Sequence, residues 1–125
     1  MKWKKRVLFL ALGIGAALMA SAAAWLVLRP VPPVTVTVVN RSGKAIASVR
    51  LEHERGAEVL ENLESGDAKA MRFEAGGETT YRLRVRFADG SELAGGGGYA
   101  EAGYEFSETI SDSAIKTDLH LPPRH

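Results

Sequence analysis

The chain has 125 residues, a formal net charge of +1 and no cysteine, which excludes disulfide bonds and a lipid-modified cysteine anchor. The charge is unevenly spread, because four of the 16 basic residues precede residue 7 whereas all 15 acidic residues follow residue 28. The chain after residue 28 is therefore acidic, which argues against binding to nucleic acid or to anionic lipid headgroups.

Residues 7–28 form an uncharged segment of 22 residues directly behind the basic segment 1–6. A helix of this length spans about 33 Å, which fits a hydrocarbon core about 30 Å thick. Excess Lys and Arg remain on the cytoplasmic side of a membrane. The pattern predicts a single-pass anchor in the cell inner membrane, with residues 1–6 in the cytoplasm and the C-terminal domain periplasmic or extracytoplasmic.

A cleaved signal peptide is the alternative interpretation of this segment. Ala20-Ser21-Ala22 matches an A-x-A cleavage site, and cleavage there would release a secreted domain. The apolar run continues to Leu28, however, and this favours an uncleaved anchor. Small residues spaced by four in the anchor permit a weak homodimer, although an alanine-rich composition with no partner is the favoured explanation of that spacing.

Residues 29–33 contain three prolines and predict a short stiff spacer. From residue 34 to residue 121 the dominant pattern is alternation of apolar and polar residues, which is typical of half-buried strands. Residues 122–125 form a tail. The predicted strands cover residues 34–38, 46–54, 57–63, 68–73, 79–87, 91–94, 103–110 and 115–121.

The clearest predicted strand covers residues 79–87, where Tyr81, Leu83, Val85 and Phe87 share one face. Turn signals such as Asp89-Gly90 separate the strands at intervals of about 8–12 residues. Seven or eight short strands with this spacing and no helical pattern predict an all-β, antiparallel sandwich of the Ig-like or transthyretin-like kind.

The opposite face of the 79–87 strand carries Arg82, Arg84 and Arg86. Side chains on one face of a strand repeat about every 6.7 Å, so three guanidinium groups in a row could bind an acidic partner. The simpler interpretation pairs them with carboxylates of a neighbouring strand, such as Glu52 and Glu54 or Glu105, without any ligand. The sequence favours this second interpretation.

A run of four glycines, Gly95, Gly96, Gly97 and Gly98, is the most unusual local feature. One interpretation is an exposed strand edge that another backbone approaches closely. The other is a mobile loop or a bulged strand. Tyr99 and Tyr104 follow the run, and they form either a small aromatic surface patch or a plug at the end of the sandwich.

The sequence contains no catalytic motif, because it lacks a cysteine nucleophile, a G-x-S-x-G element and a phosphate-binding glycine loop. The three histidines, His53, His120 and His125, lack the close spacing of a zinc site, so we expect no metal and no cofactor. His53 shares the face of Val49 and Leu51 and is expected at the edge of the core. An enzyme is the third hypothesis, in which Glu101, Glu105 and Glu108 pair for acid–base work, but their spacing is not diagnostic and acidic residues on strands are usually solvated.

These observations predict a non-enzymatic, membrane-anchored β-sandwich that acts as an interaction or accessory module outside the cytoplasmic membrane. Its expected partners are the lipid bilayer, through residues 7–28, and another membrane or envelope protein, through edge pairing around residues 95–104. A small-ligand or carbohydrate-binding domain is the alternative. It is less favoured because Tyr81, Phe87 and Phe106 are expected to face the core and are not available for stacking on a sugar.

Overall fold

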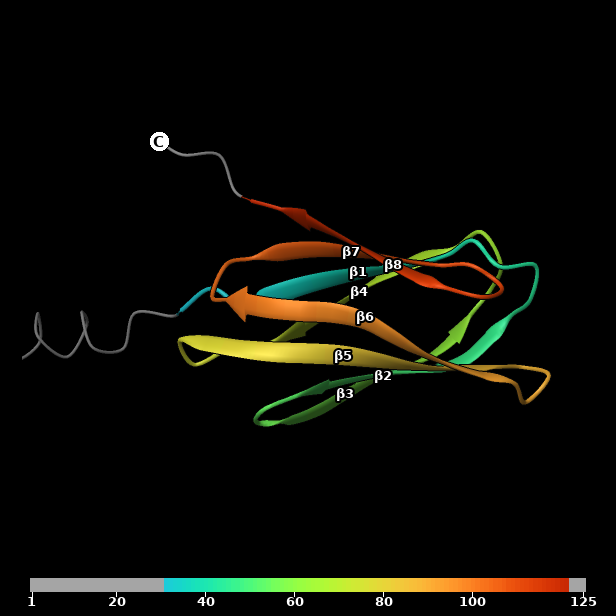
Figure 1. Ribbon diagram of the computed structural model, residues 1–125, viewed down its shortest axis with the longest axis horizontal. Helices are drawn as coiled ribbons and strands as arrows, with labels where there is room; N and C mark the ends of the chain where they lie inside the picture. Colours follow the sequence, from blue (N-terminus) through green and yellow to red (C-terminus); the bar gives the residue numbers. More distant parts are fainter. Residues whose placement is uncertain (1–30, 122–125) are drawn as a thin grey trace, which may run out of the picture. The chain divides into compact units, whose positions relative to one another are not determined.

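The computed structural model describes residues 31–121 (Figure 1). The predicted cytoplasmic segment 1–6, the predicted anchor 7–28 and the tail 122–125 lie outside the described residues, as does the first part of the spacer. No helix within residues 31–121 has the length and hydropathy needed to cross a bilayer.

The described part of the chain is an all-β unit of eight strands, which confirms the predicted class and strand number. The predicted strand 91–94 is longer than expected, because it continues through the glycine run to residue 101. The strands are β1 (Val34–Asn40), β2 (Ile46–His53), β3 (Gly56–Leu63), β4 (Ala68–Phe73), β5 (Glu78–Phe87), β6 (Glu92–Glu101), β7 (Glu105–Ile110) and β8 (Ile115–His120).

The strands form two four-stranded sheets that face each other, in the orders β4-β1-β7-β8 and β3-β2-β5-β6 (Figure 1). We call these the first and the second sheet. All strand pairs are antiparallel except β1 and β7, which run parallel from Thr35 beside Glu105 to Asn40 beside Ile110. The expectation of a purely antiparallel sandwich is wrong at this pair. Parallel neighbours need a long crossover, and here β2–β6 supply it.

Strand β1 lies in the first sheet and β2 in the second, whereas the first two strands of an Ig constant-type sandwich share a sheet. The short turn between β1 and β2 therefore carries the chain from one sheet to the other. Asn40, the last residue of β1 before this turn, is fully buried, and its side-chain amide donates hydrogen bonds to the carbonyl oxygens of Lys44 and Leu63. Its Oδ1 accepts from the amide and hydroxyl of Ser42.

The core lies between the sheets and follows from the period-two pattern of the strands. Strand β5 alternates strictly, so its odd-numbered residues from Thr79 to Phe87 are buried and its even-numbered residues are exposed. Three aromatic rings, Phe73, Tyr81 and Phe106, pack in a row with centroid distances of 5.8 and 5.0 Å. Burial of such rings and of the aliphatic side chains around them is the main stabilising contribution.

Strand β2 ends at the edge of this core. Val49 and Leu51 are buried, and the His53 ring stacks on Phe73 with a centroid distance of 4.6 Å. The Nε2 atom of His53 lies 3.5 Å from the Glu58 carboxylate. The position predicted for His53 is therefore confirmed, and its role is packing.

Candidate functional site

Four arginines share the outer face of the second sheet. Arg82, Arg84 and Arg86 alternate with the buried residues of β5 and are all exposed. Arg50 of β2 is the cross-strand partner of Arg84 and also points away from the core. Residues 31–121 contain ten basic and fifteen acidic side chains, so four of the ten positive charges of an acidic domain lie on this one face. We call it the arginine face.

The arginines of this face are only partly neutralised. Glu52 lies 3.3 Å from Nε of Arg50 and 3.2 Å from Nε of Arg84, which is the pairing that the sequence predicted for Glu52. Within residues 31–121 no carboxylate lies within ion-pair distance of Arg82 or Arg86, and neither Glu54 nor Glu105 pairs with any arginine of the face. Arg82 and Arg86 therefore keep free guanidinium groups.

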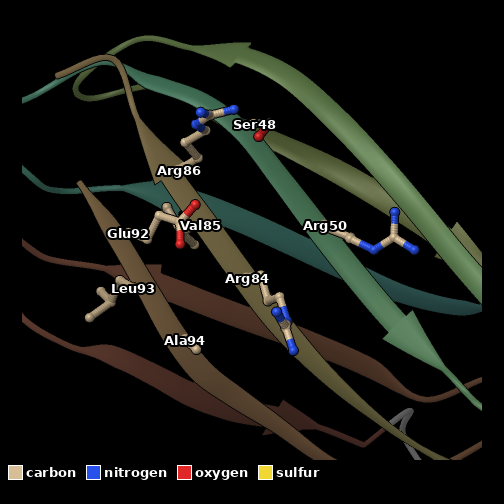
Figure 2. Close-up of a pocket in the computed structure, with 8 residues that line it drawn as sticks. All are labelled: Ser48, Arg50, Arg84, Val85, Arg86, Glu92, Leu93 and Ala94. Carbon is tan, nitrogen blue, oxygen red and sulfur yellow. The ribbon is translucent and has the colours of Figure 1, made fainter. Parts of the chain in front are cut away.

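A groove of about 380 Å³ lies on this face (Figure 2). Arg84 and Arg86 rise from β5, Arg50 comes from β2, and Glu92 projects from β6. A guanidinium group binds carboxylate and phosphate oxygens with two parallel hydrogen bonds, so three of them around one groove favour an anionic ligand. The groove is lined by Ser48, Arg50, Arg84, Val85, Arg86, Glu92, Leu93 and Ala94.

The glycine run forms a bulge in β6, which is an edge strand of the second sheet. Gly98 pairs with Tyr81 and Gly95 pairs with Leu83, so Gly96 and Gly97 together lie opposite the single residue Arg82. Both inserted glycines have positive φ, 67° and 79°, and a Cβ atom at Gly97 would lie 1.9 Å from the Tyr81 carbonyl oxygen. Glycine is required here because no side chain fits the bulge.

The bulge turns the Gly97 amide into the sandwich, where it meets a buried carboxylate. The Gly97 N–H points at Glu108 Oε1, at 2.8 Å, and at Thr117 Oγ1, at 3.0 Å. Glu108 also accepts from the Tyr81 hydroxyl at 2.7 Å and from the Thr117 hydroxyl at 2.8 Å. We call these four residues the Glu108 cluster, and it joins β5 and β6 of one sheet to β7 and β8 of the other.

The carboxylate and the phenol of this cluster are buried, whereas Gly97 and Thr117 are partly exposed. Glu108 is fully buried and Tyr81 is 3% exposed. Burial, together with the hydrogen bond to Glu108 and the charge of that carboxylate, raises the pKa of the Tyr81 hydroxyl far above its usual range. Tyr81 therefore remains a neutral hydrogen-bond donor at all physiological pH values.

The expectation that Glu108 is a solvated acid is wrong. Glu108 lies on the same face of β7 as the buried Phe106 and Ile110, because every second residue of a strand faces the same way. This alternation in the sequence was the available signal for its burial. Of its two companions, Glu105 is exposed and Glu101 is half-buried. The three carboxylates do not converge on one site, because Glu108 lies inside the core and is saturated with internal donors.

The two tyrosines after the glycine run come together as predicted. Their rings make an edge-to-face contact with a centroid distance of 6.4 Å, Tyr99 being 48% exposed and Tyr104 half-buried. The Tyr99 hydroxyl contacts the carboxylates of Glu78 and Glu101. The hydrogen bond to Glu101 is the main cause that raises the pKa of Tyr99 above its usual range.

Two further observations concern residue types that bind metals or act in catalysis. Within residues 31–121 no group of three or more His, Asp or Glu side chains is arranged to hold a metal ion. The Ser107 hydroxyl lies 3.1 Å from Nε2 of His120 on an exposed strand face, a contact that the sequence reasoning missed. No carboxylate within this range of residues orients the other ring nitrogen of His120, which a nucleophilic triad requires.

No protein-family model matches the chain, and no curated protein is similar to it at a significant level. The fold is similar to that of a protein from Eubacterium rectale solved by NMR, with a TM-score of 0.56 and 12% sequence identity. The match covers 70% of this chain and 87% of that chain. At this identity the similarity shows the all-β fold and nothing about activity.

Proposed function

We propose that the chain is a non-enzymatic interaction module, anchored in the cytoplasmic membrane by residues 7–28, whose arginine face binds an acidic segment of another envelope protein. The observation that carries this proposal is the groove between Arg50, Arg84 and Arg86. Glu52 is shared by two of the three arginines and Glu92 adds one further carboxylate, so the groove retains positive charge inside an acidic domain.

The position of the partner differs from the one favoured by the sequence. Pairing of a foreign strand along residues 95–98 needs free backbone amides at the edge of β6. The Gly97 amide is already bonded inside the Glu108 cluster, and the bulge interrupts the edge. The arginine face has neither restriction, because its side chains project from β2 and β5, the two central strands of the sheet.

We further infer that the sandwich is of the transthyretin-like kind. Of the two kinds that the sequence predicted, this one is supported by the separation of β1 and β2 into different sheets and by the parallel pairing of β1 with β7. It gives each sheet four strands and leaves the outer face of the second sheet broad enough to receive a partner.

The test is photo-crosslinking in native membranes, with a crosslinking residue in place of Ala94, which lines the groove and is exposed. Ala70 of β4, exposed in the first sheet, is the control position. We expect a specific crosslinked envelope protein from position 94 and not from position 70. Equal products from the two positions, or none from position 94, contradict the proposal.

The double variant Arg84→Gln, Arg86→Gln should abolish that product. Removing a charged partner from an interface costs about 2–5 kcal/mol, which corresponds to a loss of affinity of roughly 30-fold or more. Arg82→Gln is the matched control, because Arg82 lies on the same strand face but does not line the groove. Unfolding of each variant is measured in parallel. A variant that unfolds more readily but keeps its crosslink indicates a structural role for these arginines.

A further inference from the structure

Exposed apolar side chains gather at one end of the sandwich. Among residues 31–121, five large apolar or aromatic side chains are exposed, and four of them lie at the end where the described chain begins. These four are Val31, Tyr99, Leu119 and Leu121, with exposed fractions of 66%, 48%, 45% and 61%. The fifth, Val59, lies in the middle of β3.

Two of these side chains, Leu119 and Tyr99, are linked through shared aromatic neighbours, whereas Val31 and Leu121 flank them at the two ends of the described chain. Leu119 is the cross-strand partner of Phe106, whose ring lies 6.2 Å from that of Tyr104, and Tyr104 in turn contacts Tyr99. The turn before Tyr104 adjoins the start of the described chain, because the Gly103 amide donates to the Pro33 carbonyl. We call the surface formed by Val31, Tyr99, Tyr104, Leu119 and Leu121 the apolar end.

The opposite end of the sandwich is polar. It consists of the turns at residues 41–45, 64–67, 88–91 and 111–114, rich in Ser, Asp, Gly and Arg or Lys, and within the described chain none of these turns exposes a large apolar side chain. In Figure 1 these turns lie at the right, whereas the start of β1, the turn between β6 and β7 and the end of β8 lie at the left. Large exposed apolar side chains are therefore found at the end where the described chain begins and not at the opposite end, although the exposed Glu54, Arg55 and Glu74 lie in two other turns of the end where the chain begins.

We propose that the apolar end rests on the surface of the lipid bilayer in which residues 7–28 are anchored, so that this inference depends on the anchor in the proposed function. The chain enters the sandwich at the apolar end, and only residues 29–33 separate the uncharged segment from β1. Five extended residues reach about 16 Å, which keeps this end within contact distance of the headgroups.

The chemistry of the apolar end fits a membrane interface. Tyrosine is enriched at such interfaces because its ring is apolar and its hydroxyl is polar, and here the Tyr99 hydroxyl meets the carboxylates of Glu78 and Glu101. These carboxylates, with the exposed Glu105 beside them, oppose binding to anionic headgroups. The geometry therefore points to zwitterionic lipid as the occupant of this surface.

The test uses two single-tryptophan reporters in the full-length chain. The native Trp3 and Trp25 are replaced by Phe, and residues 31–125 contain no tryptophan, so each reporter is the sole source of emission. Tyr99→Trp places the reporter in the apolar end, and Glu64→Trp places the control in an exposed turn of the polar end. Both chains are reconstituted into phosphatidylcholine vesicles with and without brominated acyl chains.

We expect brominated lipid to remove most of the Y99W emission and to leave the E64W emission unchanged. Leu119→Ser with Leu121→Ser should reduce the quenching of the Y99W reporter. Equal quenching of the two reporters overturns the inference. The inference is also overturned if brominated lipid does not quench the Y99W emission and the emission wavelength instead shifts with the ratio of protein to lipid. In that case a second copy of the chain covers the surface.

Flotation of the same vesicles separates this inference from the proposed anchor. A chain that fails to float with the vesicles contradicts the anchor itself, whatever the fluorescence shows. A chain that floats while its Y99W reporter remains unquenched retains the anchor and overturns only the contact between the apolar end and the bilayer.

Discussion

At the residue scale, the glycine run is explained by one backbone position. Gly97 approaches the Tyr81 carbonyl so closely that no Cβ atom fits, and its amide is the donor that reaches Glu108. The sequence could show that four consecutive glycines mark unusual backbone, but not which of them is indispensable. That depends on the register shift between β5 and β6, which is a property of the assembled sheet.

Gly97→Ala is therefore expected to destabilise the sandwich by about 3 kcal/mol or more, because the added methyl group must displace backbone and not a flexible side chain. Thermal unfolding of the full-length chain in detergent micelles, followed by tyrosine circular dichroism, measures the loss. Gly43→Ala is the matched control, since the nearest atom to its Cβ position lies 4.0 Å away. Similar unfolding temperatures for the two variants would contradict the account of the bulge.

At the scale of the elements, the period-two pattern predicted the strands well, because burial on one face of a strand is a local property of its sequence. The inward faces of β2 and β5 are confirmed residue by residue. Pairing was not predictable in the same way. The parallel contact of β1 with β7 joins residues about 70 positions apart, such as Thr35 and Glu105, and no short sequence pattern encodes it.

The Glu108 cluster illustrates the same division between local and non-local information. The alternating sequence of β7 is enough to place Glu108 on the buried face of the strand. Its three hydrogen-bond donors, however, come from three other strands. Each of these groups would be costly to leave unpaired in the core. The cluster is therefore the polar link that closes the two sheets together at β6 and β8.

Removal of this carboxylate should loosen the link between the sheets. Glu108→Ala leaves the Tyr81 hydroxyl without its acceptor and leaves the Gly97 amide with Thr117 Oγ1 alone, and we expect a loss of about 2–5 kcal/mol. Hydrogen exchange at the Gly97 amide should accelerate in the same variant. Glu105→Ala, an exposed position on the same strand, is the control and should change stability by no more than about 0.5 kcal/mol. Equal effects of the two substitutions would show that the cluster contributes no stability.

At the scale of the whole molecule, the two proposed surfaces are compatible with one orientation. The groove on the arginine face reaches Arg86 and Glu92, which flank the 88–91 turn of the polar end. If the apolar end contacts lipid, this part of the groove points away from the bilayer and is open to a partner in the surrounding compartment.

This orientation requires that the sandwich and the basic N-terminus lie on opposite sides of the membrane, and the cysteine-free chain makes the requirement easy to test. Glu64→Cys places a thiol in an exposed turn of the sandwich, and Lys4→Cys places one in the basic segment. In bacterial spheroplasts a membrane-impermeant maleimide should label the first variant at once and the second only after detergent lysis. The reverse pattern would invert the topology. Recovery of labelled E64C chain in the medium and not in the membrane fraction would show cleavage. Residues 7–28 would then be a signal peptide. The sandwich would be released from the surface on which its apolar end is proposed to rest.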